Sequence, residues 1–426
     1  MRRERHGVKV FCGIDWSERH HDVAVVDETG TLVARARIGD NADGFARLLE
    51  LLGAAGDSPE ALVSVALETP RGLLVAALRA TGRPVYAINP MAAARYRDRH
   101  SVARAKSGHA DAVMLANILR TDAPAHRTLP VDSEAAQAVG VLARAQQDAV
   151  WHRTRIANEL RSLLREYYPA FLSLFAGKPS GVADPVARAV LAVAPTPAVA
   201  SRCSRPRFTV ALRRAGRQRG IAGSVETIRG SVETIRAGLR APALHQPAAV
   251  EETFGRQALA LLGILDADCR AADDLADATR TAFAAHPDHQ VITSFPGLGD
   301  LLGARVLAEI GDDRTRFPEA RNLKAYAGSS PVTRASGRSR TVVHRRVKNQ
   351  RLAATGHLWA FGALTSSAGA RAHYDRRRGG GDRHNAASRH LFNRPLGTLH
   401  HCLTTGQIYD ETRAFPPGPP ARIAAG

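Results

Sequence analysis

Apolar and polar positions in the first part of the chain alternate as short strands separated by turns and helices. Three runs, VKVFCGID, HDVAVVDE and TLVARARIG, have strand patterns, and the turn signal DETG separates the last two. A helical pattern (GFARLLELLGAAG), a strand (LVSVALE), a helix from about Gly72 to Thr81 and a strand (PVYAINP) follow. The order βββαβαβα predicts an α/β domain of the RNase H-like (RuvC-like) class, which we place at residues 8–130.

Helical periodicity dominates the middle of the chain. Apolar residues recur at helical spacing over 132–172 and again from about Val250 to Phe283, so we expect an antiparallel arm. Between them, Pro and Ala break the pattern from about Gly177 to Pro206, and RRAGRQRG at 213–220 resembles a basic connection. The heptapeptide GSVETIR occurs twice in tandem, at 223–229 and 230–236. A helix can absorb seven residues, which are nearly two turns, although replication slippage is the simpler origin of the repeat. We place this helical, coiled-coil region with its basic linker at 131–285.

Short helices and glycine turns indicate a mainly helical C-terminal region at 286–411. Its segment SFPGLGDLLGARVLAEIG predicts a helix-hairpin-helix, in which Gly297 and Gly299 shape a turn that aims backbone N–H groups at phosphate. An ordinary turn between helices is an equally good interpretation. Residues 412–426, which end in PPGPPARIAAG, are expected to be disordered.

Charge narrows the class of partner. The 426 residues suffice for two or three domains, and 59 Lys and Arg against 40 Asp and Glu leave a net charge of +19. A folded protein this cationic usually binds a polyanion, and nearly all of the positive charge is arginine, which suits phosphate. The four cysteines have no metal or disulfide spacing, and no apolar run approaches a membrane span, so we predict a cytoplasmic protein.

Three acids stand where a metal site would need them. Asp15 ends the first predicted strand, Glu68 closes LVSVALE, and Asp111 opens the helix DAVMLANILR. These strands are neighbours in an RNase H-like sheet, and hard carboxylate oxygens select Mg²⁺, which activates phosphoryl transfer. Each acid alone is more simply a solvated residue or a helix cap. Together, in this order, they favour a metal site.

A second constellation is the basic, serine-rich segment YAGSSPVTRASGRSRTVVHRRVKN. A serine is a poor nucleophile unless a base or a fixed positive charge assists it, and an arginine cluster stabilises a phosphoryl transition state. On this chemistry alone, a non-catalytic phosphate-binding loop is the better interpretation. The basic side chains predicted to bind nucleic acid are Arg334, Arg338, Arg340, Arg345, Arg346 and Lys348.

The order and spacing of several motifs resemble one family. They run from GIDWSERHHDVAVVD through ALETPRG, KSGHADAVMLANILRTD and FPGLG to LKAYAGSSPVTRASG and LHHCL. The chain resembles the insertion-sequence 110 family of transposases, also called the 116/110/902 group. That resemblance implies a RuvC-like domain with a D-E-D-D set, a coiled-coil region and a transposase domain with a serine. It further implies DNA cutting and rejoining through a phosphoserine, in a dimer or tetramer guided by an RNA from the element.

The family pattern transfers to this chain with one gap. The first, second and fourth acids fall on Asp15, Glu68 and Asp111, but the third falls on Gly108. His109 does not replace it, because one residue along a helix points about 100° away. The family's serine falls on Ser336, and Ser330 is the second choice. We hypothesise a partly decayed copy of the element; alternatively, water fills the position and activity is reduced rather than lost.

Three other functions are compatible with parts of this pattern. A remnant that has lost catalysis would still bind the element's DNA or RNA. A RuvC-like junction nuclease would need the acids but not Ser336. A sugar kinase also opens with an acidic β-meander, but no phosphate-binding loop follows here, and a charge of +19 is unexpected for an enzyme of small molecules.

Overall fold

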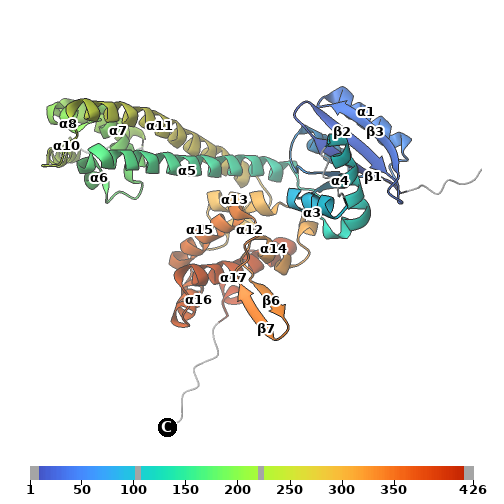
Figure 1. Ribbon diagram of the computed structural model, residues 1–426. Coiled ribbons are helices and arrows are strands. Elements are labelled where there is room, and N and C mark those ends of the chain that lie inside the picture. Colours follow the sequence, from blue (N-terminus) through green and yellow to red (C-terminus); the bar gives the residue numbers. More distant parts are fainter. Residues whose placement is uncertain (1–8, 101–106, 219–224, 417–426) are drawn as a thin grey trace, which may run out of the picture. The chain divides into compact units, whose positions relative to one another are not determined.

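The computed structural model describes residues 9–100, 107–218 and 225–416 (Figure 1). Contacts between residues divide the chain into two compact units, Met1–Val131 and Asp132–Gly426, and each is described by itself. None of the helices in the described ranges combines the length and apolar character that crossing a membrane requires.

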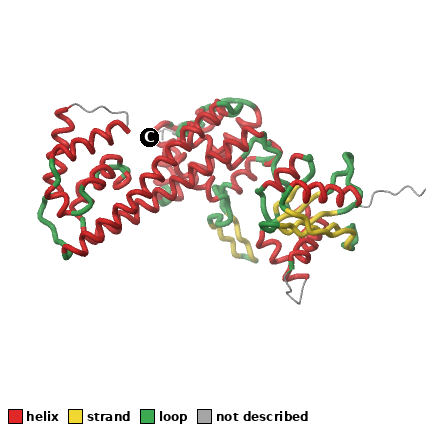
Figure 2. Tube along the Cα trace, turned by 90° about the horizontal axis from the view of Figure 1, so that it is seen from above, coloured by secondary structure: helices red, strands yellow, loops and turns green. Residues whose placement is uncertain are grey.

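Unit 1 is built on a mixed five-stranded sheet with the strand order β3-β2-β1-β4-β5. Strands β1, β2 and β3 form an antiparallel meander, whereas β4 and β5 run parallel to β1. The strands are β1 (Phe11–Trp16), β2 (His20–Val26), β3 (Leu32–Gly39), β4 (Ser64–Leu67) and β5 (Val85–Ala87). The predicted succession of strands and helices is confirmed as a mixed α/β unit, seen as the yellow group in Figure 2.

Helices cover both faces of this sheet. Alternate strand residues, such as Ile14 and Val25, pack with α1 (Ala42–Ala54) and α2 (Leu73–Ala80). The other strand residues, such as Phe11 and Ala66, pack with α3 (Pro90–His100) and α4 (Gly108–Asp122). A 3-10 turn, η1 (Ala123–Ala125), follows α4. The period-two alternation thus assigns every side chain of β1 to one of the two faces.

Unit 2 contains the predicted antiparallel arm. Its long helices are α5 (Glu134–Tyr167) and α11 (Ala248–Ala284). His152 bonds to Asp268, and the Tyr167 ring stacks on Phe254, so the sequence numbers rise on one helix as they fall on the other. The antiparallel pairing is therefore confirmed.

The segment between the arm helices differs from the prediction. The region expected to be irregular, from about Gly177 to Pro206, contains η2 (Gly181–Ala183), α7 (Pro185–Val193) and α8 (Pro197–Arg202). Helix α6 (Pro169–Phe175) precedes it, at the end of the segment predicted to be helical. The predicted basic connection is helical as far as Gln218, the end of α9 (Arg205–Gln218), because Phe208 and Leu212 pack into the arm's hydrophobic cluster while Arg213 and Arg214 are exposed. Helix α10 (Val225–Leu239) runs through the second copy of the repeat and through the first copy from Val225, where the described residues resume, as a helix that absorbs seven residues would.

The C-terminal part of unit 2 packs around Trp359, which is fully buried. Its helices are α12 (His289–Thr293), α13 (Asp300–Ile310), η3 (Arg314–Arg316), α14 (Ala320–Tyr326), α15 (Gln350–Ser366), α16 (Ala368–Gly379), α17 (His384–Thr405) and α18 (Glu411–Ala414). A hairpin of β6 (Val332–Ser336) and β7 (Ser339–Val343) follows α14. The prediction of disorder from residue 412 is wrong for the start of the tail, because Glu411–Ala414 form α18 and Phe415 packs against the C-terminal core. Residues 417–426 lie outside the described residues.

Candidate active site

The predicted acids Asp15 and Glu68 lie at the ends of two neighbouring strands, β1 and β4. In β1, Phe11 and Gly13 face α4, so Asp15 belongs to the same face by alternation. Glu68 follows the last paired residue of β4, Leu67, which lies beside Ile14. Ala66 packs on the α4 side, and Glu68 stands two residues later, in the bend just beyond the paired register. The sequence prediction that β1 and β4 are neighbours is confirmed.

A third strand acid joins them. Asp22 lies directly opposite Asp15 in the antiparallel β1–β2 pair, and its residue is 9% exposed. Its carboxylate accepts two hydrogen bonds from the Arg37 guanidinium, Nε to Oδ1 and Nη2 to Oδ2, both at 3.0 Å. Arg37 is the neighbour of Asp22 on β3, and this contact raises the pKa of its guanidinium. Asp22 and Asp15 are therefore like charges in a directly opposed pair, with one arginine beside them.

The first turn of helix α4 lies close to Asp15 and Asp22. The Ser107 side chain caps the helix by accepting from the Ala110 N–H at 3.2 Å. Gly108 is the first helical residue, and a Cβ built on it would lie 2.3 Å from Asp22 Oδ2 and 3.0 Å from Asp15 Oδ2. The position that interrupts the family's acidic pattern thus touches two carboxylates of the sheet.

Asp111 lies one helical turn after Gly108 and is 6% exposed. Its Oδ1 accepts from Arg97 Nη2 at 2.6 Å, a charge-assisted bond that ties α4 to α3. The two residues line a cavity of about 330 Å³ with Tyr96, His100 and Asn117. In this arrangement the carboxylate of Asp111 is held by an arginine.

The donor set suits a divalent cation in its chemistry. Carboxylate oxygens are what Mg²⁺ selects, and the first turn of α4, at Gly108, approaches the carboxylates of Asp22 and Asp15. Within the described residues, however, no group of three or more side chains of ligand type is close enough to hold one ion. The ligand set of Asp15, Glu68 and Asp111 therefore stays a prediction. Asp111 is paired with Arg97, and Asp22, the neighbour of Asp15, is paired with Arg37.

Ser336 ends the first strand of the exposed hairpin. It pairs with Ser339 across a two-residue turn in which Gly337 has a φ of +55°. Successive strand residues alternate between faces, so Arg334 shares the Ser336 face while Arg340, opposite Ala335, belongs to the other. Sequence analysis treated this segment as a loop. The hairpin therefore separates arginines that the sequence left in one cluster.

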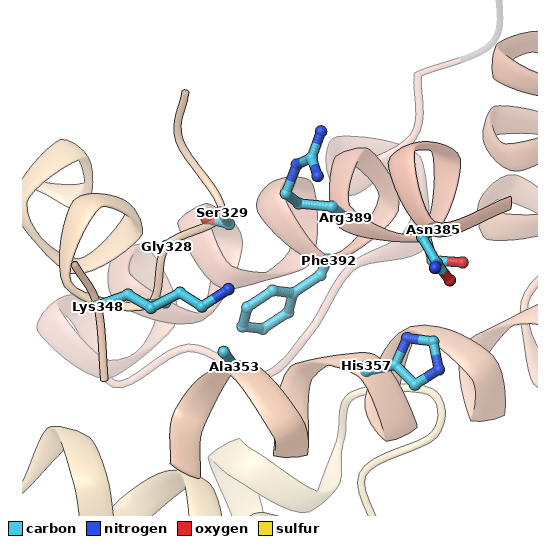
Figure 3. Close-up of a pocket in the computed structure, with 10 residues that line it drawn as sticks. Gly328, Ser329, Lys348, Ala353, His357, Asn385, Arg389 and Phe392 are labelled. Atoms are coloured by element: carbon cyan, nitrogen blue, oxygen red, sulfur yellow. The ribbon is translucent and has the colours of Figure 1, made fainter. Parts of the chain in front are cut away.

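The second-choice serine lies in a different setting. Ser329 is buried, and Asn393 on α17 donates to the side chains of Ser329 at 3.0 Å and Ser330 at 3.4 Å. Beside it is a pocket of about 200 Å³ (Figure 3), in which Lys348 extends toward the Phe392 ring and His357 and Asn385 stand at the other end. Ser330 is thus tied to a helix, whereas Ser336 is exposed.

The two glycines of the predicted helix-hairpin-helix differ in their surroundings. Gly297 has a φ of +81°, and a Cβ on it would lie 2.6 Å from the Ala363 backbone nitrogen, so packing against α15 requires a glycine there. Gly299 caps α13 and has nothing within 4 Å of its Cβ position. Only Gly299 is open to a ligand.

The remaining basic residues of the predicted nucleic-acid interface flank this hairpin. Arg338 lies in its turn, and the segment after β7 carries Arg345, Arg346 and Lys348. Arg338 and Arg346 are exposed, whereas Lys348 is partly covered where it lines the pocket.

Comparison with known proteins identifies the class to which these features belong. A family model described as transposase matches residues 12–169, which contain Asp15, Asp22, Glu68 and Asp111. A second model, described as transposase of the IS116/IS110/IS902 family, matches residues 289–375, which contain the β6–β7 hairpin. The protein is thus a transposase by class.

Two relatives match nearly the whole chain. It is 60% identical over 408 residues to the "Mini-circle putative transposase for IS117" of Streptomyces coelicolor, covering 96% of this chain and 97% of that protein. It is 30% identical over 423 residues to the "Insertion element IS116 uncharacterized 44.8 kDa protein" of Streptomyces clavuligerus, covering 98% of each. The chain belongs to the IS116/IS110/IS902 family of insertion-sequence transposases, and the predicted resemblance is confirmed.

Three residues of this site escaped sequence analysis: Asp22, Arg37 and Arg97. A signal for Asp22 was present, because a short turn between β1 and β2 places the start of β2 opposite the end of β1. The pairing of Asp22 with Arg37 could be predicted only from the register between β2 and β3, which includes a shift at Val25 and Val26. The contact of Arg97 with Asp111 depends on the packing of α3 on α4, which no local sequence pattern predicts.

Proposed function

We propose that this transposase cuts and rejoins DNA through Ser336, with Mg²⁺ bound by Asp15, Glu68 and Asp111. The observation that carries this proposal is the approach of the first turn of α4 to the strand end that bears Asp15, in a chain of this family. The strand order β3-β2-β1-β4-β5 supports an RNase H-like, RuvC-like fold for residues 8–130. A cation bound there would stabilise charge that develops on the transferred phosphoryl group.

The chemistry at the hairpin is a phosphoryl transfer. The Ser336 oxygen forms a bond to phosphorus as the ester bond from phosphorus to a deoxyribose oxygen breaks. The hydroxyl proton leaves to solvent or a base, and the departing oxygen takes up a proton. In rejoining, a DNA hydroxyl attacks the phosphoserine and releases Ser336. Arg334, on the same face of the hairpin, is placed to stabilise the negative charge.

The proposed partners are the DNA of the element ends and target, a guide RNA from the element, and further copies of this chain in a dimer or tetramer. The net charge of +19 supports binding of nucleic-acid backbones. Guidance by base pairing would leave the protein to recognise shape and phosphate. The turn at 294–299 would contribute as a helix-hairpin-helix, with backbone N–H groups near Gly299 facing phosphate.

The surroundings of the acids favour a second function, binding of nucleic acid without cleavage. Gly108 supplies no carboxylate, and Asp111 is paired with Arg97. A protein in which these features prevent metal binding would bind the element's nucleic acid without cutting it. A RuvC-like junction nuclease is a third function, and it would cut without Ser336.

A covalent-adduct assay separates these functions. The full chain, Ser336→Ala, Ser330→Ala and Asp15→Asn are each incubated with Mg²⁺, element-end DNA and RNA from the element's flank, then resolved on a denaturing gel. Ser339→Ala is the matched control, because Ser339 is the cross-strand neighbour of Ser336. We expect an adduct from the chain as it stands, Ser330→Ala and Ser339→Ala, but not from the other two.

Each alternative has its own signature in this assay. Cleavage without an adduct that persists in Ser336→Ala would indicate a nuclease. Binding without cleavage in any variant would indicate the remnant. An adduct lost only in Ser330→Ala would assign the nucleophile to Ser330.

A further inference from the structure

A side chain at position 108 would overlap with the carboxylate of Asp22. A Cβ on Gly108 would lie 2.3 Å from Asp22 Oδ2, closer than real carbon atoms approach such an oxygen, and 3.2 Å from Asp22 Cγ. Asp22 Oδ2 therefore stands beside the first turn of α4, where the family pattern places its third acid. A larger residue at 108 and Asp22 in this conformation exclude each other.

We propose that Asp22 supplies the carboxylate that Gly108 lacks, and binds the divalent cation together with Asp15. This inference rests on the proposed function, which places a cation at Asp15, and extends it to a residue outside the D-E-D-D pattern. It explains Gly108 as half of a compensated arrangement instead of a mark of decay.

The geometry of the β1–β2 pair brings the two carboxylates together. Asp15 and Asp22 are direct cross-strand partners on the face that α4 covers. One oxygen of each lies within 3.0 Å of a single point, the Cβ position of Gly108. Oxygens that bind one Mg²⁺ each lie about 2.0–2.1 Å from it. The two carboxylates thus approach each other beside the first turn of α4, where rotation of their side chains would bring an oxygen of each to one ion.

Electrostatics also favours a cation there. Like charges that face each other across two strands are destabilising, and Asp22 is largely buried. Arg37 offsets the charge of Asp22. Its side chain is 63% exposed, so it can swing into solvent without opening the hydrophobic core. A divalent cation and Arg37 would compete for the Asp22 carboxylate.

Binding of Mn²⁺, measured by calorimetry on the full-length protein, tests this proposal without relying on catalysis. Asp22→Asn keeps the size of the side chain and removes its charge, and we expect a loss of Mn²⁺ affinity of about tenfold or more. Arg37→Gln should raise the affinity, because it removes the competing cation. Asp43→Asn, a change at an exposed acid of α1, is the matched control and should leave the affinity unchanged.

Two further variants test the shared volume. Gly108→Asp alone should lower the melting temperature and fail to strengthen Mn²⁺ binding, because the new side chain meets Asp22. Combined with Asp22→Ala, which vacates the space, the same Asp at 108 should restore binding to about the level of the unaltered chain.

The outcomes separate this inference from the function on which it rests. If the unaltered chain and Asp22→Asn bind Mn²⁺ equally, Asp22 is only the partner of Arg37 and the inference fails, while a metal site at Asp15 stands. Tighter binding in Gly108→Asp without loss of stability would also overturn it. If Asp15→Asn and the unaltered chain both fail to bind Mn²⁺, the metal in the proposed function is refuted as well.

Discussion

Replacing Gly13 with alanine should disturb both the stability of unit 1 and its candidate metal site. A Cβ on Gly13 would lie 2.1 Å from the Ala112 carbonyl oxygen and 2.4 Å from the Ala116 nitrogen. Both obstacles are backbone atoms of α4, so no side-chain rotation relieves the contact. The helix must move away from β1, and it carries Gly108 and Asp111 with it.

The magnitude follows from the cost of overpacking. Adding a methyl group to a well-packed site usually costs about 1–3 kcal/mol, and an unyielding backbone places Gly13→Ala near about 3 kcal/mol. In a unit of this size, a change of about 1 kcal/mol moves the melting temperature by about 4 °C. We therefore expect the unit 1 transition of Gly13→Ala to fall by about 10 °C in calorimetry of the full chain.

Gly53→Ala in α1 is the matched control. Nothing lies within 4 Å of its Cβ position, and alanine favours a helix over glycine by about 0.5–1 kcal/mol. This variant should melt at the same or a slightly higher temperature. Calorimetry that gave the same melting temperature for both variants would refute the direct packing of α4 on β1. In Gly13→Ala, Mn²⁺ affinity should fall as well.

Three other predictions concern single residues. Arg334→Ala should lower the yield of covalent adduct about a hundredfold and Arg340→Ala much less, as densitometry of the gels would show, since only Arg334 shares the Ser336 face. Equal losses would contradict that arrangement. Gly297→Ala should destabilise unit 2 by about 3 kcal/mol in urea, because of its positive φ and its contact with α15. Gly299→Ala should cost only about 1 kcal/mol, because alanine is a poorer N-cap for α13 but meets no neighbouring atom; similar urea midpoints would argue against this packing. Burial raises the pKa of Cys12 from 9.0 to about 12, so the folded state keeps the thiol proton after the unfolded chain has lost it. The stability of unit 1 should then decline as pH rises above about 9, and the native Cys12 thiol should react with a disulfide reagent at pH 8 far more slowly than in urea; rapid native labelling would disprove its burial.

Local patterns were sufficient for most elements but not for all. The strands of unit 1 and the arm helices follow from apolar periodicity, which reflects burial of one side of each element. The hairpin of β6 and β7 was missed because its residues are nearly all exposed, so no apolar alternation marks it. The arginine-rich α9 was read as a connection, because its few apolar residues show a helix only once their partners in the arm are known.

The candidate site divides in the same way. The sequence alone determined the family, the cationic character, and the acids Asp15, Glu68 and Asp111, because these depend on residue type and order along the chain. Tertiary structure decided which groups surround them. Strand register places Asp22 opposite Asp15, and the packing of α4 brings Gly108 close to both. The packing of α3 on α4 pairs Asp111 with Arg97. Such contacts join residues distant in the chain, and their geometry exists only once the sheet and its covering helices have packed.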